Sequence, residues 1–171
     1  MDAITLHRSP LANDTVLRRI ETTLGGVTLA ATAAGLCGLW FDGQRHFPDL
    51  AQVPERRGNP ILDAAAHQLH EYFAGRRSAF ELPLDMSRGT HFQQTVWQAL
   101  LRIPAGTTTT YGALAAQLDR PRAVRAVAAA VGRNPISVIV PCHRVLGADG
   151  ALTGYAGGLD RKRRLLALEA A

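Results

Sequence analysis

The sequence feature that most constrains this chain is a β-branched apolar run that stops at a proline and presents a cysteine and a histidine side by side. Ile139 and Val140 precede Pro141, and Cys142 and His143 follow it. Because proline cannot donate to a sheet ladder, a strand is expected to end there and Cys142 to emerge in a cleft. A thiolate is a good nucleophile for carbon electrophiles, and a neighbouring imidazole can take up its proton. The alternative is core filler, since free cysteine is often buried and inert.

Charge is distributed unevenly along the chain. The net charge is +5, but residues 1–85 hold 8 Arg/Lys against 10 Asp/Glu, whereas residues 86–171 hold 11 against 4. A basic half that also carries the cysteine indicates a polyanionic partner, with nucleic acid as the first candidate. The alternative is a basic surface with no specific partner.

Hydropathy and cysteine usage restrict the environment. No apolar run approaches the roughly 20 residues that span a bilayer, and residues 1–10 contain no apolar signal-peptide core. Cys37 and Cys142 make no disulfide framework. We therefore expect a cytoplasmic protein with reduced thiols and no membrane partner, in which Cys37 is inert core.

The acidic half has the pattern of a sheet. Residues 16–20, 26–31 and 36–41 predict three short strands, and the glycine turns between them favour an antiparallel meander. Residues 78–84 predict a returning edge strand. No chemistry is visible in these segments, so this half is interpreted as a scaffold.

One helix is expected in the same half. Pro60 fits a first helical turn, apolar residues then recur at helical spacing, and Gly75 ends the element. Its opposite face is polar and carries Asp63, His67, His70 and Glu71. A metal site is conceivable there, but a solvated face is the preferred interpretation.

The basic half follows a plausible linker at residues 85–90 and predicts four helices, at residues 91–103, 111–118, 122–132 and 160–170. Thr90 is a suitable cap for the first of them. The second and third are separated only by a short break at residues 119–121. Helix, tight break and helix is the helix-turn-helix layout, although a plain αα-hairpin has the same pattern.

The third of these helices has two contrasting faces. Val124, Val127 and Val131 should pack inward. The other face and its flanks carry small residues and arginines: Arg122, Arg125, Ala126, Ala129, Gly132 and Arg133. Small residues let a helix backbone approach another surface, and arginine reaches phosphates or enters a base stack. Because a solvated face would carry Glu and Lys instead, contact with DNA is the preferred interpretation.

A glycine-rich loop follows the cysteine at residues 147–158. It lacks the GxGxxG and GxxxxGK spacings, so nucleotide phosphate binding is not indicated, and a flexible wall over Cys142 is more natural. In the last helix, Glu169 is the carboxylate that we expect to pair with His143.

Four short motifs together resemble the O6-alkylguanine-DNA alkyltransferases. Residues 141–145 read PCHRV; RAV at 125–127 and GRNP at 132–135 precede them, and GYAGG at 154–158 follows. The likeness is clear over roughly residues 87–170 and looser over 20–42. It implies an α/β ribonuclease-H-like N-terminal domain, residues 1–86, and a mainly α C-terminal domain with a helix-turn-helix, residues 87–171.

The resemblance also implies catalytic roles at matching positions. Cys142 matches the alkyl acceptor, His143 the residue that activates it through a water, and Glu169 the carboxylate that orients the histidine. Asn134 matches the asparagine that braces the turn beside the cysteine. Cys142 and His143 would face opposite ways on a regular strand, so a turn after Pro141 or a bridging water is needed to couple them.

DNA and base contacts are implied in the same way. Arg125 matches the finger that fills the gap left by a flipped base, and Tyr111 matches the tyrosine that contacts the neighbouring phosphate and the base edge. The substrate pocket is expected at Val145, Tyr155, Ala156 and Gly157, with Val145 and Ala156 acting through backbone groups. Ala156 replaces a serine of some relatives, and Ala128 and Ala129 replace their paired glycines.

The implied activity is single-turnover, irreversible transfer of an alkyl group from O6-alkylguanine, and by extension O4-alkylthymine, to Cys142. The partner is double-stranded DNA held through its minor groove, and the protein is expected to be a monomer, with clustering along DNA left open. No cysteine matches the zinc site of some relatives, so no metal or cofactor is expected. Two alternatives remain: a Cys-His hydrolase, which lacks a second signature, and a lesion-binding protein without an acceptor, which the presence of Cys142 disfavours.

Overall fold

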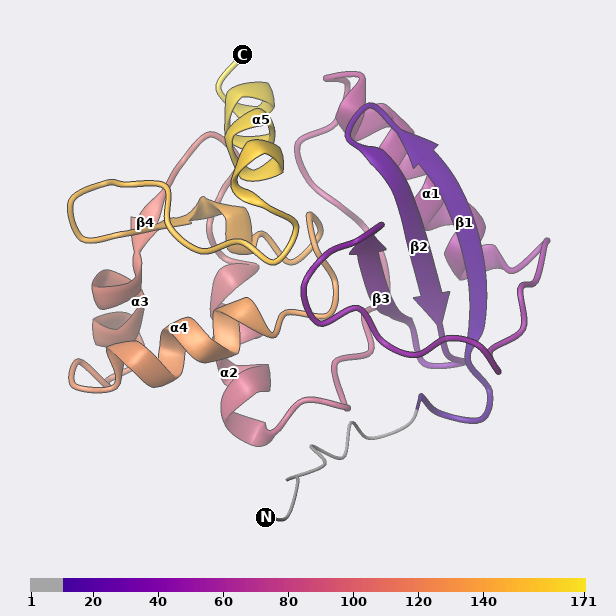
Figure 1. Cartoon of the computed structure of the whole chain (residues 1–171), viewed down its shortest axis with the longest axis horizontal. Coiled ribbons are helices and arrows are strands. Elements are labelled where there is room, and N and C mark those ends of the chain that lie inside the picture. Colours follow the sequence, from indigo (N-terminus) through magenta and orange to yellow (C-terminus); the bar gives the residue numbers. More distant parts are fainter. Residues whose placement is uncertain (1–10) are drawn as a thin grey trace.

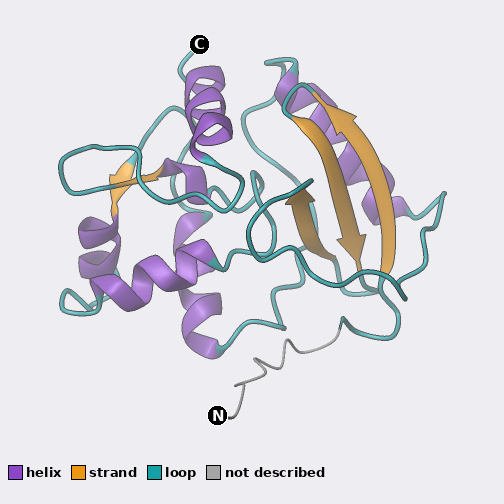
Figure 2. Ribbon diagram, viewed as in Figure 1, coloured by secondary structure: helices purple, strands orange, loops and turns teal. Residues whose placement is uncertain are grey.

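The computed structural model describes residues 11–171 and places a small sheet domain beside a helical domain (Figure 1). In the first domain, strands β1 (Val16–Thr22), β2 (Gly25–Ala31) and β3 (Leu36–Phe41) form an antiparallel sheet in that order. Helix α1 (Pro60–Phe73) covers one face of this sheet (Figure 2). The predicted meander and helix are confirmed; the expectation for residues 1–10 lies outside the described residues.

The second domain is mainly helical. Its elements in chain order are α2 (His91–Leu100), β4 (Thr109–Thr110), α3 (Tyr111–Gln117), α4 (Val124–Gly132), the 3-10 helix η1 (Cys142–Arg144), β5 (Val145–Leu146) and α5 (Leu159–Glu169). The four helices expected here are present, with ends shifted by up to three residues. Thr90 and Gln93 form a reciprocal capping box that starts α2.

One apolar core runs through both domains. Leu62 and Leu69 of α1, Leu39 of β3, Val127 of α4 and Leu165 of α5 belong to the same buried cluster. Within the second domain, the indole nitrogen of Trp97 donates to the carbonyl of Ala130 at 2.8 Å and so joins α2 to α4. This continuity means that the two domains are packed together rather than tethered by a linker.

The edge strand expected at residues 78–84 is wrong. Only Leu84 forms a bridge to the sheet, opposite Leu36. Pro83 has no N–H to donate, and the backbone of Glu81 is bound instead by both amide atoms of Gln68, at 2.8 and 3.0 Å. A side chain of α1 therefore satisfies groups that a ladder would have used.

The strand expected before Pro141 is also wrong. Leu39 of β3 donates to the carbonyl of Pro135 and accepts from the N–H of Ser137, so the segment touches the sheet only around Ile136. The chain then turns, and the N–H of Val140 donates back to the carbonyl of Ile136 at 3.0 Å. Val138 lies at φ 71°, which a β-branched residue adopts only in a strained turn.

Gly35, just before β3, lies against the backbone of Pro83 and Leu84 in the segment that leads to the second domain. A Cβ at this position would lie 2.6 Å from the carbonyl oxygen of Pro83. We predict that Gly35→Ala lowers the free energy of unfolding by about 1–3 kcal/mol, because backbone must move to admit the methyl group. Gly132→Ala is the control, since nothing lies within 4 Å of its added Cβ. Urea unfolding of both variants measures the difference; equal stabilities would contradict the prediction.

Candidate active site

Cys142 is the first residue of η1, immediately after the turn that replaces the expected strand. Asn134 shapes this turn: its side-chain nitrogen donates to the carbonyl of Val140 at 2.7 Å and to the sulfur of Cys142 at 3.1 Å. Its side-chain oxygen accepts from the N–H of Ile136 at 2.9 Å. One amide thus closes the loop and fixes the sulfur.

The environment of Cys142 disfavours a free thiolate. The residue is 6% exposed, and burial raises the pKa of the thiol, although the hydrogen bond from Asn134 and the charge of Lys162 partly oppose this shift. A nucleophilic role therefore requires a base that removes the proton when the thiol reacts.

His143 presents one ring nitrogen to Glu169 and leaves the other open as an acceptor. Its Nε2 lies 2.7 Å from Oε1 of Glu169, and the histidine side chain is fully buried. Since an ionised carboxylate only accepts, Nε2 carries the proton and Nδ1 is left as an acceptor. Nδ1 is buried without a hydrogen-bond partner among the described residues. Burial lowers the pKa of His143, so the imidazole is neutral near pH 7.

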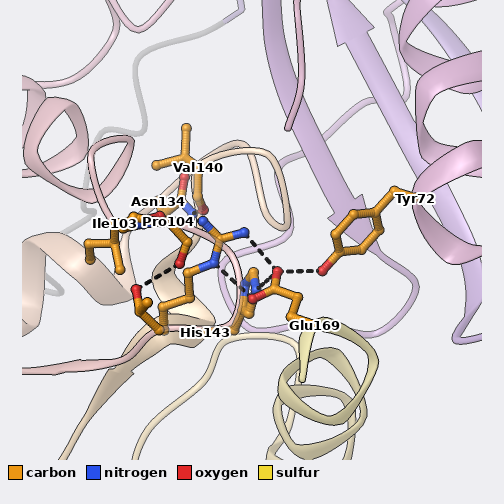
Figure 3. A network of polar contacts seen from close by, with 9 residues as sticks. Tyr72, Ile103, Pro104, Asn134, Val140, His143 and Glu169 are labelled. Atoms are coloured by element: carbon orange, nitrogen blue, oxygen red, sulfur yellow. Dashed lines mark hydrogen bonds and ion pairs between the residues drawn. The ribbon is translucent and has the colours of Figure 1, made fainter. Parts of the chain in front are cut away.

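Glu169 is the centre of a buried polar network (Figure 3). Arg144 donates from Nε to Oε2 at 2.9 Å and from Nη2 to Oε1 at 2.8 Å. The hydroxyl of Tyr72, on α1 of the sheet domain, donates to Oε1 at 2.7 Å. Burial opposes ionisation of Glu169, but the hydrogen bonds from His143 and Arg144 outweigh it and hold the pKa of the carboxyl well below its usual range.

The glycine-rich loop is held by a buried lysine. Nζ of Lys162 donates to the carbonyls of Val145 at 2.6 Å, Thr153 at 2.8 Å and Gly154 at 3.3 Å. These bonds fasten the loop to β5, directly after η1. The loop also reaches the sheet domain, where the N–H of Arg45 donates to the carbonyl of Ala156 at 2.9 Å.

A cavity of about 440 Å³ opens beside Cys142. Its lining comes from α3, α4, η1, the glycine-rich loop and the sheet domain: Arg45, His46, Tyr111, Ala128, Ala129, Val131, Gly132, Arg133, Cys142, Thr153, Gly154, Tyr155 and Ala156. The sulfur is therefore buried yet adjoins a hollow beside the small-residue face of α4. A larger cavity of about 730 Å³ lies between the domains, and Cys142 does not line it.

Several predicted site residues lie outside the lining of the smaller cavity. Val145 is fully buried with its carbonyl bound by Lys162, and the carbonyl of Gly157 accepts from Arg161 at 3.0 Å. Three exposed residues on α4 or just before it do not line the cavity: Arg122, Arg125 and Ala126. Asn134 contacts the sulfur of Cys142 but does not line the cavity.

Sequence reasoning missed Tyr72, Arg144, Lys162 and the cavity wall at Arg45 and His46. Lys162 did carry a signal: it is the single lysine beside 18 arginines, and it shares a helical face with Leu165 and Glu169. Tyr72 carried none, because 97 positions separate it from Glu169.

Cys37 and the polar face of α1 lie apart from the site around Cys142. Cys37 is buried, and burial together with the charge of Asp85 raises its pKa to about 11, which suits an unreactive core thiol. Within residues 11–171, no three His, Cys, Asp or Glu side chains gather as metal ligands would. On α1, Asp63 pairs with Arg18 and His67 with Glu71. No helix in this range is long and apolar enough to cross a membrane.

Comparisons with known proteins identify the family. The family descriptions "6-O-methylguanine DNA methyltransferase, ribonuclease-like domain" and "DNA binding domain" match residues 16–86 and 91–171. A Mycobacterium tuberculosis protein named methylated-DNA–protein-cysteine methyltransferase is 48% identical over 152 residues, 89% of this chain and 90% of the relative. The chain belongs to the 6-O-methylguanine DNA methyltransferase family.

Other members agree in sequence and in fold. A Methanosarcina barkeri member of the same name is 46% identical over 151 residues, 88% of this chain and 94% of the relative. The crystal structure of Mycobacterium tuberculosis OGT in complex with DNA aligns with a TM-score of 0.84 at 46% identity, over 91% of this chain and 92% of that one. The family's fold, a small sheet domain followed by a helical domain, is the one found here.

Glu169 should make the stability of this methyltransferase depend on pH. Its pKa is depressed in the folded state, so its contribution is complete above the unfolded value, about 4.5, and is lost as the pH falls toward the folded value. We predict that Glu169→Gln lowers the free energy of unfolding at neutral pH by about 3 kcal/mol, because Arg144 loses its buried counter-charge. The gap to the wild type should narrow below pH 4.5 in urea unfolding; a gap that does not change with pH would contradict this.

Proposed function

We propose that the protein repairs DNA by direct damage reversal, moving the alkyl group of O6-alkylguanine to the sulfur of Cys142 once per molecule. The observation that carries the proposal is the position of Cys142, beside a cavity walled by α4 and next to the buried His143–Glu169 pair. Relatives named methylated-DNA–protein-cysteine methyltransferase support the same reaction. O4-alkylthymine is proposed as a second substrate.

The reaction balances without a cofactor. The sulfur forms a bond to the alkyl carbon while the bond between that carbon and O6 breaks. The electron pair of the breaking bond stays on the O6 atom of guanine. Nδ1 of His143 takes the thiol proton, relayed by a water because no direct hydrogen bond joins the two side chains, and guanine regains one proton as it leaves. The thioether that remains has no good leaving group, so the protein acts once.

The other site residues have supporting roles in this proposal. Asn134 braces the sulfur, while Tyr111, Tyr155 and Ala156, which line the cavity, contact the flipped base. We assign Val145 and Gly157 to the pocket through their backbones, which Lys162 and Arg161 hold in place.

DNA binding is assigned to the helix-turn-helix made by α3 and α4. The proposed contacts are Arg122, Arg125, Ala126, Ala129 and Arg133, all of them exposed. Small side chains let α4 enter the minor groove, and Arg125 fills the space of the extruded base, which offsets part of the cost of unstacking. We further propose a monomeric, cytoplasmic protein whose domains divide between residues 86 and 87.

Alkyl uptake tests the function directly. Incubation with duplex DNA containing O6-methylguanine should add one methyl mass to the peptide bearing Cys142, at no more than one equivalent per protein. Cys142→Ala should abolish the transfer and keep DNA binding, because the sulfur makes no part of the exposed α4 surface. Intact-protein and peptide mass spectrometry measure both. Repeated turnover, or label on Cys37 instead, would overturn the proposal.

Arg125 should matter only when a base must be held out of a duplex. We predict that Arg125→Ala slows repair of duplex DNA by about tenfold or more, with a much smaller effect on the reaction with free O6-benzylguanine. Arg163→Ala is the matched control, because it removes the same charge from an exposed position on α5. Single-turnover rates on both substrates provide the comparison. An equal loss on duplex and free base would remove the finger role.

A further inference from the structure

Tyr72 connects the sheet domain to the active-site carboxylate. It lies in the last turns of α1, is 1% exposed, and packs against the rings of Phe73 and Phe80, each with centroids 5.3 Å away. Its hydroxyl donates to Oε1 of Glu169 at 2.7 Å. Figure 3 shows Tyr72 reaching Glu169 from the side opposite the helical domain's own contacts.

The carboxylate of Glu169 is held from three directions. Arg144 engages both oxygens, whereas His143 and Tyr72 share Oε1. Arg144 fixes the plane of the carboxylate and takes up part of the acceptor capacity of Oε1, so His143 and Tyr72 share what remains on that oxygen. The hydroxyl therefore takes part of the negative charge of the very oxygen to which His143 donates.

Filling space alone does not account for a tyrosine at this position. A phenylalanine would occupy the same volume and bring no polar group into the core, and Phe73 and Phe80 show that the surrounding cluster accepts plain rings. A buried hydroxyl costs free energy unless it is paired, and here its partner is supplied by the other domain. The hydrogen bond exists only while the sheet domain is packed against the helical domain.

We propose that Tyr72 is a positioning residue for the alkyl transfer: its hydroxyl orients Glu169 and limits the charge that Glu169 presents to His143. The sheet domain thereby supplies a part of the activating chain that runs from Tyr72 through Glu169 to His143. This inference rests on the proposed function, since it assumes that His143 takes the proton of Cys142.

The consequence is a definite direction of pH dependence. The charged and titratable groups around the imidazole are Glu169 and Lys162 from α5, Arg144 from η1 and, through Glu169, Tyr72 from α1. Removing the hydroxyl leaves more negative charge on Oε1, which stabilises the protonated imidazole and raises the pKa of His143. Less of the neutral base is then present at a given acidic pH. As the pH falls, the variant therefore loses activity at a higher pH than the wild type does.

The experiment compares the pH dependence of single-turnover alkyl transfer in the wild type and Tyr72→Phe. We expect the acid limb of the variant to shift to higher pH, with a loss of about tenfold at the acid end, typical of one hydrogen bond to a charged group, and a smaller loss at the alkaline end. Nitrogen-15 NMR of the His143 ring gives a second readout, in which its pKa rises in the variant.

Phe80→Leu is the matched control, because it loosens the packing around the Tyr72 ring and keeps the hydroxyl. It should lower the thermal midpoint without moving the acid limb. A uniform loss at every pH in Tyr72→Phe, or an unchanged pKa of His143, would overturn the inference. If the wild type itself fails to alkylate Cys142, the proposed function fails instead, and the two outcomes are thus distinct.

Discussion

The buried ion pair between Glu169 and Arg144 is the interaction on which the rest of the site depends. A carboxylate taken out of water is costly unless its partner and hydrogen bonds are in place, and removing one member of such a pair costs about 3–5 kcal/mol. Here Arg144 binds both oxygens and also donates to the carbonyl of Ile103, just beyond α2. The pair therefore joins α5, η1 and the end of α2, and it positions His143 and Cys142 as neighbours of Arg144 in η1.

The site is built by both domains rather than by the helical one alone. Backbone hydrogen bonds join the loop that leads to Cys142 to Leu39 at the edge of β3. Another backbone hydrogen bond joins the glycine-rich loop to Arg45. Asn134 then converts the anchored segment into a tight turn that ends at the sulfur. The sheet domain thereby fixes the shape of the hollow beside Cys142.

The basic charge of the C-terminal half is used in two ways. Arg144 and Lys162 are buried and bind a carboxylate and backbone carbonyls. Arg122, Arg125 and Arg133 are exposed around α4, where phosphates can reach them. The net charge of this half thus overstates the charge available to DNA, and the arrangement on α4 is more informative than the sum.

The sequence by itself determined the helices, the three-stranded meander and the adjacency of a thiol and an imidazole. Apolar periodicity and caps located the helices, glycine turns located the meander, and the run PCHR placed a thiol beside an imidazole, because each of these depends on residues within a few positions of one another. Only the tertiary structure decided that Ile139 and Val140 form a turn, that residues 78–84 are held by Gln68, and that Tyr72 reaches Glu169. Those outcomes depend on which distant side chain satisfies a buried polar group, and residue spacing along the chain carries no information about that competition.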